Sequence, residues 1–289
     1  MIGNTLVKYL SSKRIRVVEI NREGFGTSPG NPVFKFDVVG NTASNLLQFI
    51  KPESTIINFV GLIRHKIDLH DEQSLLEASK VNSIFPIDLA KLSGATGCRL
   101  IQIGTDCVYS GSRGGYSESS VPDPVDFYGQ SKLAGEIEAS HVLTLRVSVI
   151  GHELTKHIEL LDWVLRQPSH SKINGFENHI WNGVTALSFA RILEAEIFDP
   201  IYNSGTFHIV PQDVVDKYQL IKEIARIWGR KDLNIERFSD SRSVNRTLQT
   251  NFHAKNREIW NKSGYPSIPS ISMMLQEYFN WDQALARGK

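Results

Sequence analysis

The chain has 289 residues, of which 41% are hydrophobic, and its 32 basic and 31 acidic side chains leave a formal net charge of +1. This length suits one large domain or two coupled domains with a substantial core. The balanced charge, and the lack of any apolar run near the roughly 18 residues of a membrane span, argue against nucleic-acid and membrane binding. The two cysteines, Cys98 and Cys107, are too few for a disulfide framework, so we expect a reducing, cytoplasmic compartment.

Strand-like and helix-like segments alternate through the first half of the chain. Strands are predicted over residues 15–20, 33–36, 55–60, 99–103 and 142–147. Helices are predicted over residues 42–50, 74–92 and 127–139, the second of them bent or broken near Pro86. Strands separated by helices of this length indicate an α/β fold with a doubly wound parallel sheet. We assign residues 1–150 to this domain.

The second half is less regular. Helices are predicted over residues 154–166, 187–198, 218–228 and 271–286, and short strands over 206–210 and 233–236. Smaller elements after a regular wound half indicate a substrate-binding region built on a cofactor domain. We assign residues 151–289 mainly to that region, with some segments returning to the first domain.

The segment from Gly24 to Gly30, GFGTSPG, is similar to a glycine-rich phosphate loop. A dinucleotide loop must open a helix, whose N-terminal N–H groups hold the pyrophosphate. Pro29 and a strand-like run follow here, so an exposed turn is the better interpretation.

The segment HELTKH, from His152 to His157, almost matches the helix of a zinc protease. The two histidines of that motif are four residues apart, whereas these are five apart, which is about 140° around a helix. We therefore predict no metal site here, and two solvent-facing or substrate-side histidines.

The strongest chemical signal is Tyr128-Gly-Gln-Ser-Lys132 in the predicted helix 127–139. Residues four apart share a helix face, so Tyr128 and Lys132 should point into one cleft. An ammonium near a phenol should lower the tyrosine pKa from about 10 and allow proton transfer to or from a sugar oxygen. Thr105, at the end of the preceding strand, should hydrogen-bond the same oxygen. The motif gains weight from this context, because the Tyr/Lys spacing alone also occurs on ordinary surface helices.

The surrounding segment, from Arg99 to Glu136, resembles the extended short-chain dehydrogenase/reductase family, and within it the dTDP-4-dehydrorhamnose reductase-like group. That group carries Ser/Thr-Thr-Asp at a strand end, a Val-Phe/Tyr pair and Gly, Tyr-x-Glu, Pro, and Tyr-Gly-x-Ser-Lys-x-x-Gly-Glu. The counterparts here are Thr105, Asp106, Val108, Tyr109, Gly111, Tyr116, Glu118, Pro124 and residues 128–136. Cys107 departs from the pattern, because the family usually has an aromatic residue there. The resemblance covers most of the chain and is looser after residue 151.

The resemblance implies a Rossmann-like fold in which NADPH or NADH delivers hydride to a 4-keto sugar carbon, for surface-polysaccharide precursors. In that scheme Tyr128 protonates the new oxygen, Lys132 binds the cofactor ribose and tunes Tyr128, and Thr105 orients the carbonyl. Related sugar-nucleotide dehydratases have Thr-Asp-Glu at the strand end, whereas this chain has Cys107 in place of the Glu, which disfavours dehydration.

Two alternatives stay open. An NAD-dependent nucleotide-sugar epimerase would hold its cofactor tightly without net turnover. A non-catalytic nucleotide-binding or regulatory subunit would bind a partner instead, as the regulatory subunit of methionine adenosyltransferase does with this fold. The oligomeric expectation is a monomer or homodimer.

Cofactor contacts are expected at the ends of the early strands. Asn21 and Arg22 stand where NAD-preferring folds place an acidic residue, and Arg22 suits a 2′-phosphate, so NADPH is favoured, with NADH possible. Asp37 resembles the family's adenine-side Asp, and Val60 and Gly61 should lie beside the cofactor.

Substrate contacts are expected from His152, Trp181, Asn182 and Arg246. Trp181 should stack on a base or sugar, and Arg246 should meet a phosphate. A core tryptophan and a solvated arginine are equally good interpretations from sequence alone.

Residues 1–10 resemble the end of the family's glycine loop and the helix after it, with Gly3 as its last glycine. The first strand and the earlier glycines of that loop have no counterpart. We therefore expect the natural protein to carry about ten more residues before Met1, the length of a strand and loop.

Overall fold

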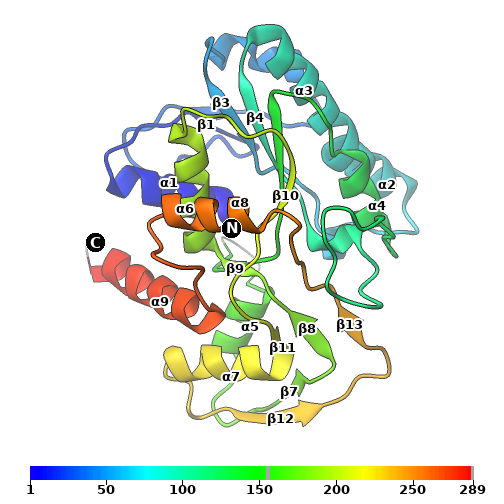
Figure 1. The fold of residues 1–289 in the computed structure, drawn as a ribbon, viewed down its shortest axis with the longest axis vertical. Coiled ribbons are helices and arrows are strands. Elements are labelled where there is room, and N and C mark those ends of the chain that lie inside the picture. Colours follow the sequence, from blue (N-terminus) through cyan, green and yellow to red (C-terminus); the bar gives the residue numbers. More distant parts are fainter. Residues whose placement is uncertain (154–156, 288–289) are drawn as a thin grey trace.

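The computed structural model describes residues 1–153 and 157–287, and its centre is a parallel sheet (Figure 1). The strands are β3 (Thr55–Asn58), β4 (Arg99–Ile103), β5 (Val142–Arg146) and β10 (Gly205–His208), hydrogen-bonded in the order β10-β5-β4-β3. Every residue of β5 is buried, as expected for an inner strand of a parallel sheet covered on both faces. The predicted α/β class is confirmed.

A second, two-stranded parallel sheet holds the earliest strands. β1 (Glu19–Asn21) pairs with β2 (Val33–Lys35), and among the described residues neither strand is hydrogen-bonded to β3. The parallel strands therefore form two sheets where the sequence suggested one. β1 also begins later than the predicted strand 15–20, because the Ile15 N–H bonds the Leu10 carbonyl as the chain leaves α1 (Ile2–Ser12).

Alternate residues of β4 face opposite layers of helices. Ile101 and Ile103 are buried with α1 and α6 (Ala186–Phe198), whereas Leu100 is buried with α3 (Phe85–Thr96). Figure 1 shows α1 and α6 on one side of the central sheet and α3 on the other. Because the four strands of the central sheet are parallel, their carboxyl ends lie at one edge of the sheet.

The predicted long helix 74–92 is interrupted as expected near Pro86. α2 (Glu72–Ser79) continues through a π-helical turn (Lys80–Ile84) into α3. Proline has no N–H, so it cannot bond the carbonyl four residues earlier, that of Asn82. A wider turn at this place accommodates the missing bond.

Two other predicted helices differ from the expectation. The helix expected over 42–50 is a 3₁₀ helix (Ala43–Phe49). α4 (Phe127–Ala134) ends well before residue 139, at Gly135. A Cβ on Gly135 would lie 2.1 Å from the Asn82 carbonyl oxygen, so the end of α4 is set by its close packing on the π-helical turn.

Short strands build the second region, at the lower end of the molecule in Figure 1. β7 (Lys172–Phe176) pairs in parallel with β12 (Asn234–Phe238). β8 (His179–Trp181) lies between β11 (Val215–Asp216) and β13 (Val244–Asn245), and β6 (Val149–Ile150) pairs with β9 (Val184–Thr185). β10 instead joins the central sheet beside β5. A division of the chain at residue 150 stays a prediction.

The remaining helices are α5 (Leu160–Leu165), α7 (Lys217–Ile227), α8 (His253–Lys262) and α9 (Ile271–Arg287). The first three residues of the predicted helix 154–166 lie outside the described residues, and α5 covers its second half. α8 was not predicted, because its sequence is mostly polar and its register is set by the buried Trp260. No helix in the described part of the chain is long and apolar enough to cross a membrane.

Candidate active site

Thr105 and Tyr128 meet where β4 ends and α4 begins. The Thr105 Oγ1 accepts a hydrogen bond from the Cys107 N–H at 3.2 Å, which caps a 3₁₀ turn (Asp106–Val108). A Cβ on Gly129 would lie 2.2 Å from the Cys107 carbonyl oxygen, so a glycine is needed for the first turn of α4 to pack here. This packing brings the Tyr128 phenol close to the Thr105 hydroxyl, which acts to lower the pKa of the phenol.

Lys132 lies one turn further along α4. Its ammonium donates a 2.8 Å hydrogen bond to the Ile103 carbonyl at the end of β4. Burial lowers the pKa of Lys132 to about 8, while the Glu136 carboxylate acts to raise it. The helix therefore places a lysine with an easily lost proton directly behind the Thr105 turn.

The Tyr128 phenol has a raised pKa. Burial is the main cause, the neighbouring Cys107 adds to it, and the hydrogen bond with Thr105 acts in the opposite direction. The expectation that Lys132 lowers this pKa is wrong in the structure, because desolvation dominates and the lysine is bonded to Ile103. A partly buried phenol with a raised pKa holds its proton at neutral pH and is suited to donate it.

Asp106 and Cys107 form the wall of the site beside Tyr128. Burial raises the pKa of Asp106, and the charges of Arg246 and Lys217 lower it. Burial raises the pKa of the Cys107 thiol to about 12. At neutral pH this residue is therefore a neutral thiol and no nucleophile.

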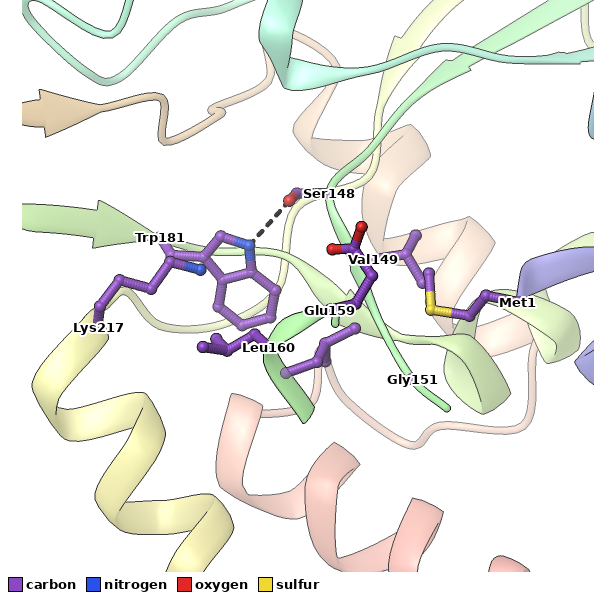
Figure 2. A pocket seen from close by; sticks show the side chains of 9 residues that line it. Met1, Ser148, Val149, Gly151, Glu159, Leu160, Trp181 and Lys217 are labelled. Carbon is purple, nitrogen blue, oxygen red and sulfur yellow. Dashed lines mark hydrogen bonds between the residues drawn. The ribbon is translucent and has the colours of Figure 1, made fainter. Parts of the chain in front are cut away.

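A cavity of about 130 Å³ lies on the Lys217 side of these groups (Figure 2). Its lining comes from β6 and the residues around it, the start of α5, β8 and the start of α7. The lining residues are Met1, Ser148, Val149, Ile150, Gly151, Glu159, Leu160, Trp181 and Lys217. The Trp181 indole N–H donates a 2.8 Å hydrogen bond to the Ser148 hydroxyl, drawn as a dashed line in Figure 2.

Two of the four predicted substrate residues lie by this site. Trp181 lines the cavity and is 7% exposed. Arg246 donates to the Tyr109 carbonyl at 3.0 Å, and its charge acts on Asp106. These positions place an aromatic surface and a guanidinium near the end of β4.

The other two predicted substrate residues are engaged elsewhere. The His152 imidazole bonds Asp162 at 2.6 Å, with its ring beside that of Tyr278. The Asn182 amide donates to the Leu248 carbonyl and accepts from its N–H, at 2.7 and 2.9 Å. Both side chains therefore tie segments of the chain together.

The HELTKH segment lies partly outside the described residues, since 154–156 are not among them. His157 bonds the second oxygen of Asp162 at 3.0 Å, so both histidines of the motif converge on one carboxylate. No set of three His, Cys, Asp or Glu side chains in the described ranges is arranged as metal ligands.

The predicted cofactor residues follow the carboxyl ends of three parallel strands. Asn21 and Arg22 lie at the end of β1, Asp37 after β2, and Val60 and Gly61 after β3. The Asn21 side chain accepts from the N–H groups of Glu23 and Gly24, and so organises the turn after β1.

Arg22 and Asp37 are held only locally, and the residues after β3 are accessible. The Arg22 side chain is 71% exposed and contacts Glu23 at 3.3 Å, and Asp37 accepts from the Val39 N–H. Val60 is exposed, and nothing approaches within 3.4 Å of a Cβ built on Gly61.

Gly3 lies in the first turn of α1 and not in a loop. A Cβ at this position would come within 3.1 Å of the Phe59 ring, so the glycine allows α1 to approach the end of β3 closely. The GFGTSPG segment connects β1 to β2 with no helix between them, and Phe25 is 80% exposed. It is the exposed turn that the sequence indicated.

Several of the family-like residues serve the architecture behind the site. The Arg146 guanidinium bonds Glu136 through Nη2 at 2.6 Å and the Tyr109 hydroxyl at 2.7 Å. The Tyr109 ring stacks on the Tyr116 ring at 4.4 Å. Glu118 accepts from the Thr250 hydroxyl at 2.7 Å. This network joins the β4–α4 segment to the later part of the chain.

Lys217, Ser148 and Glu159 were missed from the sequence. Lys217 is the first residue of an amphipathic helix, where a lysine is expected to be a solvated surface residue. Its ammonium instead lies over the Trp181 ring, 5.1 Å from the centroid. Only the packing of α7 against β11 and β8 shows this position.

Comparison with known proteins identifies the family to which the chain belongs. Residues 1–251 match the family model described as the RmlD substrate binding domain. The chain belongs to this family. The predicted resemblance to dTDP-4-dehydrorhamnose reductases is thereby confirmed at the level of the family.

The curated proteins that this RmlD-family chain resembles include a subunit of methionine adenosyltransferase and a glycan biosynthesis reductase. Methionine adenosyltransferase 2 subunit beta of Bos taurus is 28% identical over 179 residues, which is 57% of this chain and 52% of that protein. A probable low-salt glycan biosynthesis reductase of Haloferax volcanii is 28% identical over 165 residues, 53% of each chain. The chain spans about half the length of these curated relatives.

Solved structures of low sequence identity share the fold. The dTDP-4-dehydrorhamnose reductase of Clostridium acetobutylicum is 20% identical and superposes with a TM-score of 0.71, covering 98% of this chain and 96% of that one. MoeE5 in complex with UDP-glucuronic acid and NAD is 19% identical, with a TM-score of 0.74 and the same coverage. The Rossmann-like fold is thus established.

Proposed function

We propose that this RmlD-family protein reduces a 4-keto nucleotide-linked deoxysugar with NAD(P)H, in the cytoplasm, for surface-polysaccharide precursors. The observation that carries the proposal is the contact of the Tyr128 phenol with Thr105 at the end of β4, with Lys132 one turn behind. The raised pKa of Tyr128 favours this direction, because reduction of a carbonyl needs a proton donor and not a base.

The residues present fit a dinucleotide along the carboxyl ends of the strands, where open parallel sheets bind their ligands. Val60 and Gly61 after β3 are accessible, and Arg22 and Asp37 have side chains free to contact a ligand. Support comes from a dTDP-4-dehydrorhamnose reductase of Bacillus anthracis solved with NADP, 21% identical with a TM-score of 0.70. The nicotinamide cofactor would supply hydride to the sugar carbon.

The chain's own groups then act on the carbonyl oxygen. Thr105 donates a hydrogen bond that orients the carbonyl, and Tyr128 transfers its proton to the oxygen as negative charge develops there. The resulting phenolate regains a proton from solvent, and Lys132, one turn along α4 and bonded to the Ile103 carbonyl, is expected to contact the cofactor ribose. The neutral thiol of Cys107 stands where the related dehydratases carry the Glu of their Asp-Glu pair, which favours reduction over dehydration.

The first prediction concerns Tyr128. Tyr128→Phe removes the proton donor and keeps the ring, so NADPH oxidation with a 4-keto sugar nucleotide should fall by at least about 10²-fold. Steady-state kinetics followed at the NADPH absorbance would measure this, and NADPH affinity of the variant serves as the folding control. Full activity in the variant contradicts the mechanism. Conversion of a sugar nucleotide without NADPH oxidation would instead indicate an epimerase.

Cofactor preference gives a separate test. Arg22 is exposed at the end of β1, and a guanidinium suits the 2′-phosphate of NADPH. We expect NADPH to bind more tightly than NADH, and Arg22→Ala to remove the difference. Equal or tighter binding of NADH by the unaltered chain would contradict the preference.

A second candidate function is that of a partner-binding subunit. The observation that favours it is the match to methionine adenosyltransferase 2 subunit beta in several vertebrates, which reaches 75% of this chain for Xenopus tropicalis. Under this function the chain would form a stable complex with another protein and show no turnover. Pull-down from its native source, combined with the NADPH oxidation assay, separates the two functions.

A further inference from the structure

Lys217 occupies an unusual position for a lysine. It is the first residue of α7, and its ammonium reaches back over the Trp181 ring into the cavity of Figure 2. Its charge acts on Asp106 and Cys107 at the end of β4 and on Glu159 at the start of α5. The residue therefore lies between the candidate catalytic turn and the cavity.

Three features make this position unfavourable for a cation. Burial lowers the pKa of Lys217 to about 8. The N-terminus of a helix carries partial positive charge, which repels an ammonium in its first turn. Among residues 1–153 and 157–287 the Lys217 ammonium makes no hydrogen bond and no ion pair, and it lies over the Trp181 ring, 5.1 Å from the centroid. The three N–H donors of this ammonium therefore have no hydrogen-bond partner within those ranges.

The Glu159 carboxylate lines the same cavity but forms no ion pair with the Lys217 ammonium. Glu159 has a side chain that is 45% exposed and lies 3.7 Å from the His65 imidazole, so it faces toward solvent and that ring. Asp106 has a raised pKa from burial and is also within the field of Arg246. Lys217 is thus the positively charged side chain among the described residues that line the cavity, and Glu159 is directed away from it.

We propose that Lys217 binds an anionic oxygen group of the nucleotide-sugar substrate, either a phosphate or a carboxylate on the sugar. The inference rests on the proposed function. The cavity volume of about 130 Å³ suits one such group and not a whole sugar nucleotide. An anionic oxygen would accept from the ammonium, and the Ser148 hydroxyl bonded to Trp181 lies in the same cavity as a further polar contact.

The experiment compares the binding of defined probes by calorimetry. The probes are UDP and dTDP, UDP-glucose and dTDP-glucose, and UDP-glucuronate. Lys217→Met should weaken binding by at least about tenfold, the loss expected for one charge-assisted hydrogen bond, and Lys217→Arg should retain most of it. An equal loss for all probes identifies a phosphate, whereas a loss confined to UDP-glucuronate identifies a sugar carboxylate.

A matched control lies on the same helix. Lys222 also has its ammonium over an aromatic ring, that of Tyr218 at 5.2 Å, but it is exposed and does not line the cavity. Lys222→Met should bind every probe as the unaltered chain does. Lys217→Met should be at least as stable as that chain in urea, because it removes a partly buried cation from a helix N-terminus.

Two results overturn the inference in distinguishable ways. If the unaltered chain binds the probes and Lys217→Met binds them equally well, Lys217 is not a ligand-binding residue and the proposed function stands. If the unaltered chain binds none of the probes, the proposed function fails and the inference fails with it. A clear loss of stability in Lys217→Met, with unchanged affinity, would assign the residue to packing.

Discussion

At the scale of single residues, the candidate site depends on groups held out of water. Tyr128 keeps its proton because burial raises its pKa, and it meets Thr105 because Gly129 leaves room for the Cys107 carbonyl. The Tyr-Gly pair of the motif thus has a steric cause beside its chemical one. Proton donation by a desolvated phenol is consistent with a reductase.

A residue-scale prediction concerns the Arg146–Glu136 ion pair behind the site. Both side chains are less than a tenth exposed, at 8% and 9%, and the guanidinium also holds the Tyr109 hydroxyl. Arg146→Met would leave the Glu136 carboxylate buried and unpaired, and should lower the free energy of unfolding by about 3–5 kcal/mol. Urea denaturation measures this loss.

The control for that prediction is a pair of similar geometry at the surface. Arg226 contacts Glu223 at 2.7 Å, with its side chain 59% exposed. Arg226→Met should leave the urea midpoint nearly unchanged, because water replaces the lost partner. Similar losses in both variants would show that burial does not decide the effect.

At the scale of elements, the π-helical turn before Pro86 packs against α4, the helix that carries Tyr128 and Lys132. The turn leaves the Asn82 carbonyl where Gly135 can pack closely upon it, and the Asn82 side chain donates to the Ser131 hydroxyl in α4 at 3.0 Å. The bend in one helix therefore fixes the position of the helix that carries Tyr128 and Lys132.

An element-scale prediction follows for Gly135. A Cβ there would meet the Asn82 carbonyl oxygen at 2.1 Å, so Gly135→Ala must displace α4 and should cost about 1–3 kcal/mol of stability. Gly40→Ala, at an exposed position with no atom within 4 Å of the added Cβ, should be tolerated. Equal urea midpoints for the two variants would contradict the packing argument.

At the scale of the whole molecule, a histidine links α5 to the C-terminal helix. The His152 imidazole bonds Asp162 in α5 at 2.6 Å and faces Asp282 in α9 at 3.6 Å, and the Tyr278 hydroxyl accepts from its main-chain N–H. These carboxylates raise the pKa of His152 against the opposing effect of burial. The same imidazolium lowers the pKa of Asp162.

The pH dependence of stability follows from the direction of this shift. The pKa of His152 is higher in the folded protein than its unfolded value of about 6.5. Protonated His152 therefore stabilises the folded state fully below about pH 6.5, and this stabilisation is lost as pH rises through the folded-state pKa. Urea denaturation at several pH values above 6 should therefore show a decline that His152→Asn largely abolishes. His70→Asn, at an exposed histidine, should retain it. An unchanged decline in His152→Asn would assign the effect to other groups.

The local geometry of the candidate site was predictable from sequence, whereas the pKa shift of Tyr128 was not. The strand ending at Ile103, the turn at Thr105 and the helix spacing of Tyr128 and Lys132 depend on residues close together in the chain, so periodicity and motif place them correctly. The bend near Pro86 was predictable for the same reason, because the missing N–H is a property of one residue.

Sequence alone thus determined the parallel α/β architecture and the residues of the Thr105–Tyr128–Lys132 group, since short-range sterics and hydrophobic pattern specify both. Tertiary structure alone decided the two-sheet arrangement, the engagement of His152 and Asn182 away from the cavity, and the approach of Lys217 to Asp106. It also reversed the expected pKa shift of Tyr128. Such outcomes depend on desolvation and on contacts between segments up to about a hundred residues apart, which no local pattern encodes.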